Sequence, residues 1–227
     1  MLFRFVKLSL VFVLLSPAVA STSRIWNLPR QEINFIGREK QLMDLEDSLP
    51  KNHLVAIVGL AGIGKTSLAK EFALKHRESY QVVWFIDLKK DLDGQLHQLA
   101  LELSRKKIIS FEVSPYNVSE GVNTALSWLR STEAGWLLIF DNVEKNVDIS
   151  TSFPDLNNHP HKHVIVTTRY NPGWCKKLLL KSFSGKEAFE FLQHLLGDEY
   201  PMEELLKLAS VLGNHPRALL QASSYIN

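Results

Sequence analysis

The segment Gly59-Leu60-Ala61-Gly62-Ile63-Gly64-Lys65-Thr66 has the residue types and spacing needed to bind phosphate groups, because it matches the pattern G-x-x-x-x-G-K-[ST] in full. Glycines let main-chain N–H groups curl around a phosphate without Cβ clashes. The Lys65 ammonium can reach β- and γ-phosphates, and the Thr66 hydroxyl can ligate Mg²⁺. Ser67 is expected beside the α-phosphate. The residues that we predict to contact phosphate, in this segment and directly after it, are Gly59, Gly62, Ile63, Gly64, Lys65, Thr66 and Ser67.

An aspartate follows a run of apolar residues further along the chain. Asp141 ends the segment that begins at Trp136, and an acid at such a strand end can hold Mg²⁺ together with Thr66. The next residue is Asn142, where many hydrolytic relatives carry a second acid that orients water. Asparagine cannot take up a proton. We therefore expect slow hydrolysis, or binding without turnover.

A third chemical group stands at the end of the segment Val164–Thr168. There, the Arg169 guanidinium can contact a γ-phosphate and respond to its presence. A surface arginine at a strand end is the alternative interpretation. Lys65, Asp141 and Arg169 are the residues that we predict to take part in any catalysis.

These groups share a position relative to the predicted elements. Four apolar runs typical of buried strands alternate with segments of helical periodicity, which predicts an α/β fold with a parallel sheet and helices on both faces. Gly59, Asp87, Asp141 and Arg169 follow these runs directly, and ligands of such sheets bind at the carboxyl ends of the strands. The runs are residues 54–58, 82–86, 136–140 and 163–168.

The order of these runs indicates one class of P-loop NTPase. Asp141 lies 76 positions after Lys65, and residues 82–86 intervene. An extra strand before the acid-bearing strand, followed by an arginine strand, favours ATPases of the additional-strand (ASCE) type. Nucleotide kinases and GTPases usually place the phosphate-loop strand and the acid strand side by side. An Asn-Lys-x-Asp guanine-recognition motif is missing from the sequence, which favours adenine nucleotides.

The alternation ends at about Cys175. Ser184 to Glu187 form a capping box that opens a helix, and two further helical segments follow. We therefore predict a P-loop α/β domain over residues 21–175 and a small helical subdomain over residues 176–227.

Residues 1–20 have the pattern of a secretory signal peptide. Arg4 and Lys7 precede an apolar stretch, and Ala18-Val19-Ala20 forms an A-x-A cleavage site. The alternatives are an uncleaved anchor, which would be the only membrane contact expected, and an amphipathic or buried N-terminal helix. Export is the expected localisation. A cytoplasmic location is the alternative, because ATP is scarce outside the cytoplasm.

Composition excludes several other classes of protein. The chain has 26 Lys and Arg against 24 Asp and Glu, and without Arg4 and Lys7 the counts are equal, so a broadly basic surface for specific nucleic-acid binding is not expected. A single cysteine, Cys175, excludes a small secreted fold held by internal disulfides.

With these residues in place, the chain from about Phe35 resembles the NB-ARC domains of STAND-type signalling ATPases. Two positions depart from the family pattern: Asn142 replaces its second acid, and Arg217 stands where it prefers leucine. The winged-helix part with its ADP-sensing histidine is not found, so the resemblance covers a truncated form. The segments that carry the resemblance are Phe35–Glu39 (hhGRE), Gly59–Thr66, Val83–Asp87, Leu137–Val143, Val164–Arg169 (hhhTTR) and Leu212–Leu219 (GLPLA).

The resemblance implies a nucleotide site and a regulatory role. Ile36 and Arg38 would border the adenine, Pro216 would pack on it, and Arg169 would meet the γ-phosphate. The implied ligand is ATP or ADP with Mg²⁺. The implied function is a nucleotide-dependent conformational switch that acts on another protein or self-associates. An active ATPase or phosphotransferase, and a non-catalytic exported interaction module, are the alternative hypotheses.

Overall fold

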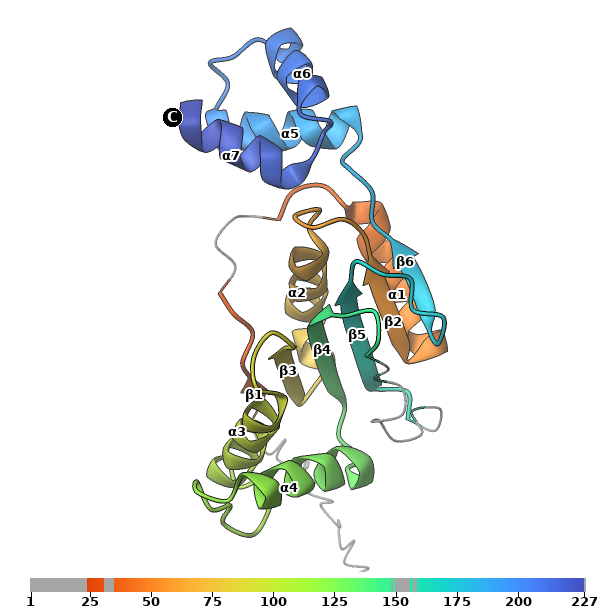
Figure 1. The fold of residues 1–227 in the computed structure, drawn as a ribbon, viewed down its shortest axis with the longest axis vertical. Coiled ribbons are helices and arrows are strands. Elements are labelled where there is room, and N and C mark those ends of the chain that lie inside the picture. Colours follow the sequence, from red (N-terminus) through yellow and green to blue (C-terminus); the bar gives the residue numbers. More distant parts are fainter. Residues whose placement is uncertain (1–23, 31–34, 148, 150–155, 157–158, 227) are drawn as a thin grey trace, which may run out of the picture.

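The computed structural model describes residues 24–30, 35–147, 149, 156 and 159–226 (Figure 1). Its centre is a six-stranded sheet in the order β1-β3-β4-β5-β2-β6, and every neighbouring pair of strands is parallel. The predicted α/β class is therefore confirmed. The strands are β1 (Ile25–Trp26), β2 (Leu54–Val58), β3 (Val82–Asp87), β4 (Trp136–Val143), β5 (Lys162–Thr168) and β6 (Lys176–Leu179).

The helices form two sets. Four of them belong to the α/β part, and three follow the last strand and form a separate layer beyond the carboxyl ends of the strands (Figure 1). A short 3₁₀ turn, Arg77–Ser79, follows the second helix. The helices are α1 (Glu39–Asn52), α2 (Lys65–Lys75), α3 (Leu92–Arg105), α4 (Val118–Ser131), α5 (Gly185–Leu196), α6 (Met202–Val211) and α7 (Pro216–Ile226).

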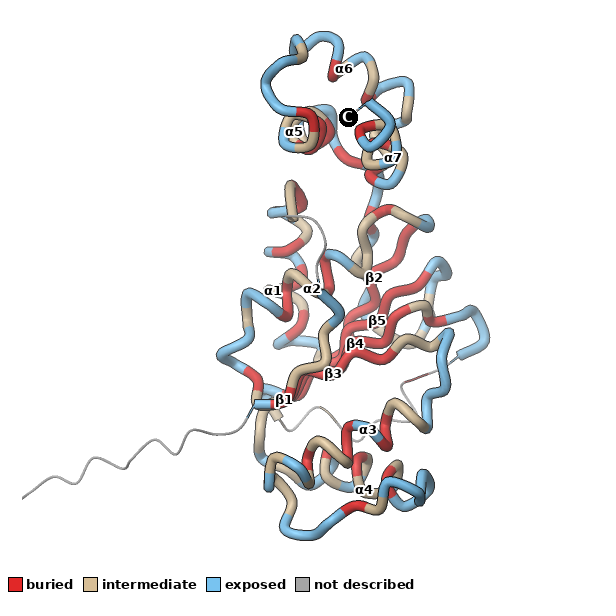
Figure 2. The backbone as a smooth tube through the Cα atoms, turned by 90° about the vertical axis from the view of Figure 1, so that its left-hand side faces the viewer, coloured by how far each residue is buried: buried red, intermediate tan, exposed pale blue. Residues whose placement is uncertain are grey.

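The buried strands divide their side chains between two cores, as the period of two along a strand requires. On β4, Trp136, Leu138 and Phe140 face one core, which α3 and α4 cover, whereas Leu137 and Ile139 face the core that α1 and α2 cover. Figure 2 shows the central strands as buried almost throughout. Both faces of the central sheet are apolar, so each of these strands is a continuous run of apolar residues in the sequence.

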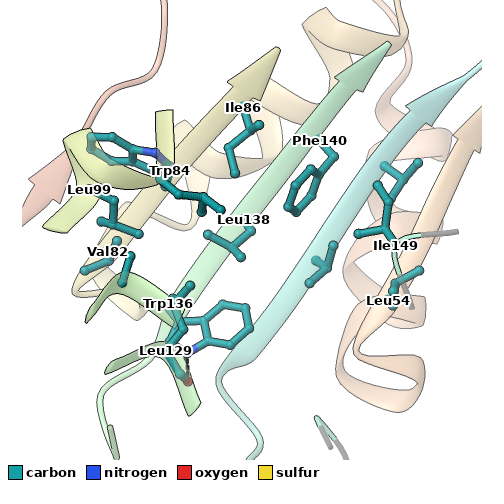
Figure 3. Packing of buried hydrophobic residues seen from close by; sticks show 14 of the residues in the cluster. Leu54, Val82, Trp84, Ile86, Leu99, Leu129, Trp136, Leu138, Phe140 and Ile149 are labelled. Carbon is teal, nitrogen blue, oxygen red and sulfur yellow. Dashed lines mark hydrogen bonds between the residues drawn. The ribbon is translucent and has the colours of Figure 1, made fainter. Parts of the chain in front are cut away.

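The large aromatic of β4 is buried without an unsatisfied polar group. Trp136 is fully buried, and its indole Nε1 donates a hydrogen bond to the carbonyl oxygen of Leu129 at 3.0 Å (Figure 3). Because Leu129 belongs to α4, this bond ties the helix to the sheet. A buried indole N–H without such a partner would cost about 1–3 kcal/mol.

The strand order confirms the additional-strand class. In space, the strand between β2 and β4 is β5, the arginine strand. β3, which lies between them in the sequence, instead pairs with the far side of β4. The phosphate-loop strand and the acid strand are thus separated by one strand, as the class requires.

Several local features differ from those predicted. β1 and β6 are edge strands that the sequence analysis did not include, and β6 occupies residues assigned there to the helical subdomain. β6 is mostly exposed, so it lacks the apolar run of a buried strand. Helix α1 contains Pro50 and ends at Asn52, and the Asp91 side chain caps α3 by accepting from the Gly94 backbone N–H.

The helical segment α5–α7 has its own small apolar core. Its first helix begins with the predicted capping box: the Ser184 hydroxyl accepts from the Glu187 backbone N–H, and the Glu187 carboxylate accepts from the Ser184 N–H. None of the helices described has both the length and the apolar character needed to span a bilayer. Residues 1–20, for which we predict a signal peptide or anchor, lie outside the described residues.

Candidate functional site

The loop Gly59–Thr66 joins β2 to α2 and has the backbone geometry of an anion cradle. Gly62 and Gly64 have φ angles of 72° and 99°, a region that L-residues with a Cβ avoid. Gly64 is the N-cap of α2, so no side chain caps this helix, and its first turn contains no acid. The free N–H groups and the positive end of the helix dipole are therefore available to a phosphate.

Gly59 is required for a different reason, the close approach of the chain that follows β6. A Cβ on Gly59 would lie 2.5 Å from the carbonyl oxygen of Leu180. Leu180 is held there because its N–H donates to the Val58 carbonyl oxygen at 2.7 Å. The start of the phosphate loop is thus pinned against the sheet edge.

The Lys65 side chain folds back over its own loop. Its Nζ donates hydrogen bonds to the carbonyl oxygens of Gly59 at 3.0 Å and Leu60 at 2.8 Å. Burial lowers the pKa of Lys65, and Arg169 lowers it further, whereas Asp141 acts in the opposite direction. An added anion would relieve the repulsion between the two cations, so this pair favours a negatively charged ligand.

The Thr66 hydroxyl and the Asp141 carboxylate are in direct contact. Thr66 Oγ1 donates to Asp141 Oδ1 at 2.6 Å, and Thr167 Oγ1 of β5 donates to the same oxygen at 2.5 Å. Asp141 is almost fully buried. Hydroxyl and carboxylate oxygens are the hard donors that Mg²⁺ prefers, so the donor set present fits this ion. Thr66 and Asp141 are the residues that would hold it.

Asn142 lies within an irregularity of the β4–β5 pairing, between Phe140 and Val143, and has a positive φ of 66°, which asparagine tolerates better than most residues. Its Nδ2 donates to Asp87 Oδ1 at 2.9 Å and to Asp141 Oδ2 at 3.0 Å, and its backbone N–H donates to Thr167 Oγ1 at 3.1 Å. The amide thereby satisfies two carboxylates that lie opposite each other on adjacent strands.

A cavity of about 810 Å³ opens beside the phosphate loop, between the α/β part and the helical segment. Of the predicted site residues, Gly59 and Asp141 are not among those that line it. The structure brings the other predicted residues together around this one cavity. They are Ile36, Arg38, Gly62, Ile63, Gly64, Lys65, Thr66, Ser67, Arg169 and Pro216.

Arg38 has a position that the sequence did not indicate. Its guanidinium lies over the Phe183 ring, 4.4 Å from the centroid, and donates to the carbonyl oxygens of Ile63 at 3.3 Å and Lys181 at 2.7 Å. Its backbone N–H donates to Glu187 Oε1 at 3.0 Å. Burial lowers the pKa of Arg38, and Glu187 opposes that shift. The side chain thus links the phosphate loop to the segment that leads into α5.

Arg169 and Pro216 reach the cavity from opposite parts of the molecule. Arg169 is exposed just after β5 and lies beside the Tyr170 ring, whereas Pro216 is buried at the start of α7. The residue before it, His215, has its Nε2 3.1 Å from the Ala61 carbonyl oxygen. The helical segment therefore contacts the phosphate loop directly.

The walls of the cavity are strongly basic. Glu144 is the one acidic residue among the described residues that line it. Such an excess of positive charge in a hollow attracts a polyanion. The lining cations are Arg30, Arg38, Lys65, Lys70, Lys89, Arg169 and Arg217.

Sequence reasoning missed several residues of the site. Asp87 was noted only as a strand end, although it accepts a hydrogen bond from Asn142. Glu187 was noted only as part of a capping box, although it accepts one from the predicted site residue Arg38. Thr167, which contacts Asp141, could have been found from the sequence, because it belongs to the Thr-Thr-Arg motif. Arg217 could also have been found, because it departs from the NB-ARC pattern described above.

Comparison with known proteins places the chain in a family. The model of the NB-ARC domain family matches residues 38–199. A nucleotide-binding leucine-rich repeat (NLR)-like protein of Hyaloscypha variabilis is 26% identical over 96% of the chain, which spans 25% of that relative's length.

Solved structures share the fold at lower identity. A STAND protein with a tetratricopeptide repeat sensor from Pyrococcus horikoshii has a TM-score of 0.56 and 22% identity; the match covers 88% of this chain and 30% of that protein. A Walker-type ATPase of Pyrococcus abyssi has a TM-score of 0.56 and 18% identity, covering 90% and 71%. The replication initiator DnaA bound to AMPPCP and single-stranded DNA has a TM-score of 0.54 and 15% identity, covering 85% and 63%. Together with the family match over most of the chain, the fold and the phosphate loop show that this chain belongs to the NB-ARC family of STAND-type P-loop NTPase domains.

Proposed function

We propose that the chain binds ATP or ADP, with Mg²⁺, in the cavity between its α/β part and its helical segment, and acts as a nucleotide-dependent conformational switch with slow or no hydrolysis. The observation that carries the proposal is the contact between Thr66 and Asp141, 2.6 Å apart at the end of an uncapped, glycine-rich phosphate loop. This arrangement places hard oxygen donors beside free N–H groups, as a magnesium–phosphate ligand requires.

An adenine nucleotide is supported by the size and lining of the cavity. Its volume of about 810 Å³ is that of a cofactor site, and Ile36, Pro216 and Phe183 provide apolar surface for a base. The DnaA structure that shares the fold contains the ATP analogue AMPPCP. When bound, Mg²⁺ would neutralise part of the charge of the phosphates.

A switch function is supported by the two direct links between the parts that enclose the cavity. The His215 ring contacts the Ala61 carbonyl, and the Arg38 guanidinium joins Ile63 to Lys181. A ligand on the phosphate loop therefore lies against groups that position the helical segment. A third phosphate, paired with Lys65 and Arg169, would change how the two parts dock.

Slow or absent hydrolysis is supported by the position of Asn142. Its amide nitrogen is committed to Asp87 and Asp141, and an amide cannot take a proton from water. Adenine nucleotide binding without efficient turnover is what we expect.

The test is the thermal shift that each nucleotide produces. A ligand that binds only the folded state raises its stability by mass action, by about 2.7 kcal/mol at a hundred times Kd. We expect ADP and ATP with Mg²⁺ to raise the Tm of the chain, and Lys65→Ala to abolish the rise. Lys207→Ala, an exposed lysine on α6 away from the cavity, is the control and should keep it. An equal shift in Lys65→Ala would contradict the proposal.

A further inference from the structure

Arg217 packs directly on the phosphate loop, although it comes from the helical segment. It is the second residue of α7. A Cβ added to Gly62 would lie 2.8 Å from both Cβ and Cδ of Arg217, and 3.1 Å from Cε1 of His215. The aliphatic stem of Arg217 therefore covers Gly62, and only a glycine leaves room for it there.

The guanidinium of Arg217 is available to bind a ligand. Within the part of the chain that the structure describes, the Arg217 guanidinium makes no hydrogen bond or ion pair, and the residue is exposed at the cavity wall. Two other basic residues close to the loop differ in this respect: Arg38 is buried and bonds to two carbonyls, and Lys65 bonds to the loop itself. Arg169 resembles Arg217, because within the described residues its guanidinium has only the Tyr170 ring beside it. A leucine at position 217 would supply the same packing without the charge.

We propose that Arg217 binds the terminal phosphates of the nucleotide from the helical side of the cavity. This inference rests on the proposed function. A guanidinium presents parallel N–H donors that match phosphate oxygens, and such charge-assisted bonds are about twice as strong as neutral ones. Lys65 and Arg169 approach from the α/β part, and Arg217 approaches from α7. The phosphates would thus be held between the two parts by cations from both.

The consequence is a direct link between phosphate occupancy and the helical segment. Each added phosphate gives Arg217 an interaction that exists only when α7 lies against the loop. A ligand can shift an arrangement only through such a differential contact. Arg217 would therefore give the helical segment a second attachment to the nucleotide, beside the packing expected of Pro216.

The test is calorimetric titration of the full chain with AMP, ADP and ATP, in the presence of Mg²⁺. For Arg217→Leu, which keeps the packing surface, we expect ATP affinity to fall about tenfold or more, as loss of a charged hydrogen bond does. ADP affinity should fall less, and AMP affinity should not change. Arg217→Lys should retain part of the affinity, and Lys207→Ala should behave like the unchanged chain.

The remaining outcomes contradict the inference, and each shows whether the inference alone or the proposed function as well has failed. Unchanged ATP affinity in Arg217→Leu shows that the guanidinium does not touch phosphate, while the proposed function stands. An equal loss for AMP and ATP shows that the residue acts on the base or the fold. If the original chain, without any substitution, binds none of the three nucleotides, the proposed function and this inference are both refuted. Unfolding of the ligand-free variants by heat separates a damaged fold from a lost contact, since Arg217→Lys and Arg217→Leu should melt alike.

Discussion

The amide of Asn142 bridges two carboxylates, with its Nδ2 2.9 Å from Asp87 Oδ1 and 3.0 Å from Asp141 Oδ2. Asp87 and Asp141 end adjacent strands and face each other in register. Two acids so placed repel each other unless a donor lies between them. Asn142 is therefore a structural part of this site as well as a replacement for a second acid.

This bridge predicts the effect of restoring the acid. Asn142→Asp removes both N–H donors and adds a third carboxylate, so we expect the free energy of unfolding at pH 7 to fall by about 1–3 kcal/mol. Chemical denaturation at pH 7 measures the loss.

Asn146→Asp is the matched control, since it makes the same change at an exposed position of the following turn. It should leave stability within about 0.5 kcal/mol of the original chain. Equal stability of Asn142→Asp and the original chain at pH 7 would show that the bridge contributes nothing.

A second prediction concerns the pinned start of the phosphate loop. Gly59→Ala places a methyl group 2.5 Å from the Leu180 carbonyl oxygen, which is backbone and cannot rotate away. We expect a loss of about 1–3 kcal/mol in unfolding free energy, the usual cost of overpacking. Urea denaturation of this variant measures the change.

Gly173→Ala is its control, because nothing lies within 4 Å of a Cβ at Gly173. That variant should be at least as stable as the original chain, since alanine restricts the unfolded state. If the two variants proved equally stable, the close approach of Leu180 to Gly59 would be refuted.

A third prediction concerns a buried histidine at the opposite end of the sheet. His163 lies within β5, its Nδ1 is 2.7 Å from the Tyr80 hydroxyl, and its Nε2 has no hydrogen-bond partner among the described residues. Burial, and then repulsion from His53, His161 and His76, lowers the pKa of His163 from 6.5 to about 4. The folded state therefore keeps this ring neutral where the unfolded state protonates it.

The sign of the pH dependence follows from that shift. Between pH 6.5 and pH 4 the unfolded state binds more protons, so stability falls as the pH falls, by a total on the order of 3 kcal/mol. Above pH 6.5 the contribution is constant. We expect His163→Gln, which keeps an acceptor for Tyr80 and does not titrate, to lose less stability across this range. Tm measured from pH 7 to pH 4.5 checks it, and parallel curves for the two proteins would contradict it.

Much of the fold could be predicted from local patterns. The strands β2, β3, β4 and β5 are buried on both faces, so their sequences are continuous apolar runs. Each could therefore be predicted without knowledge of the strands beside it. The edge strand β6 was not, because its exposed residues carry no apolar pattern and it exists only by pairing with β2.

The candidate site divides in the same way. The phosphate loop and Asp141 could be predicted because glycine spacing and strand-end position are local properties of the chain, and the additional-strand class followed from their order. The contacts of Arg38 with Lys181, of Asn142 with Asp87 and of Arg217 with Gly62 could not.

What the sequence by itself determined is therefore the chemistry available at the carboxyl ends of the strands. What only the tertiary structure decided is which distant groups meet that chemistry. Ala61 and His215, for example, are 154 positions apart and touch through the docking of α7 on the loop. Such contacts depend on the packing of whole elements against each other, and that packing is a property of the assembled sheet and helices rather than of any short segment.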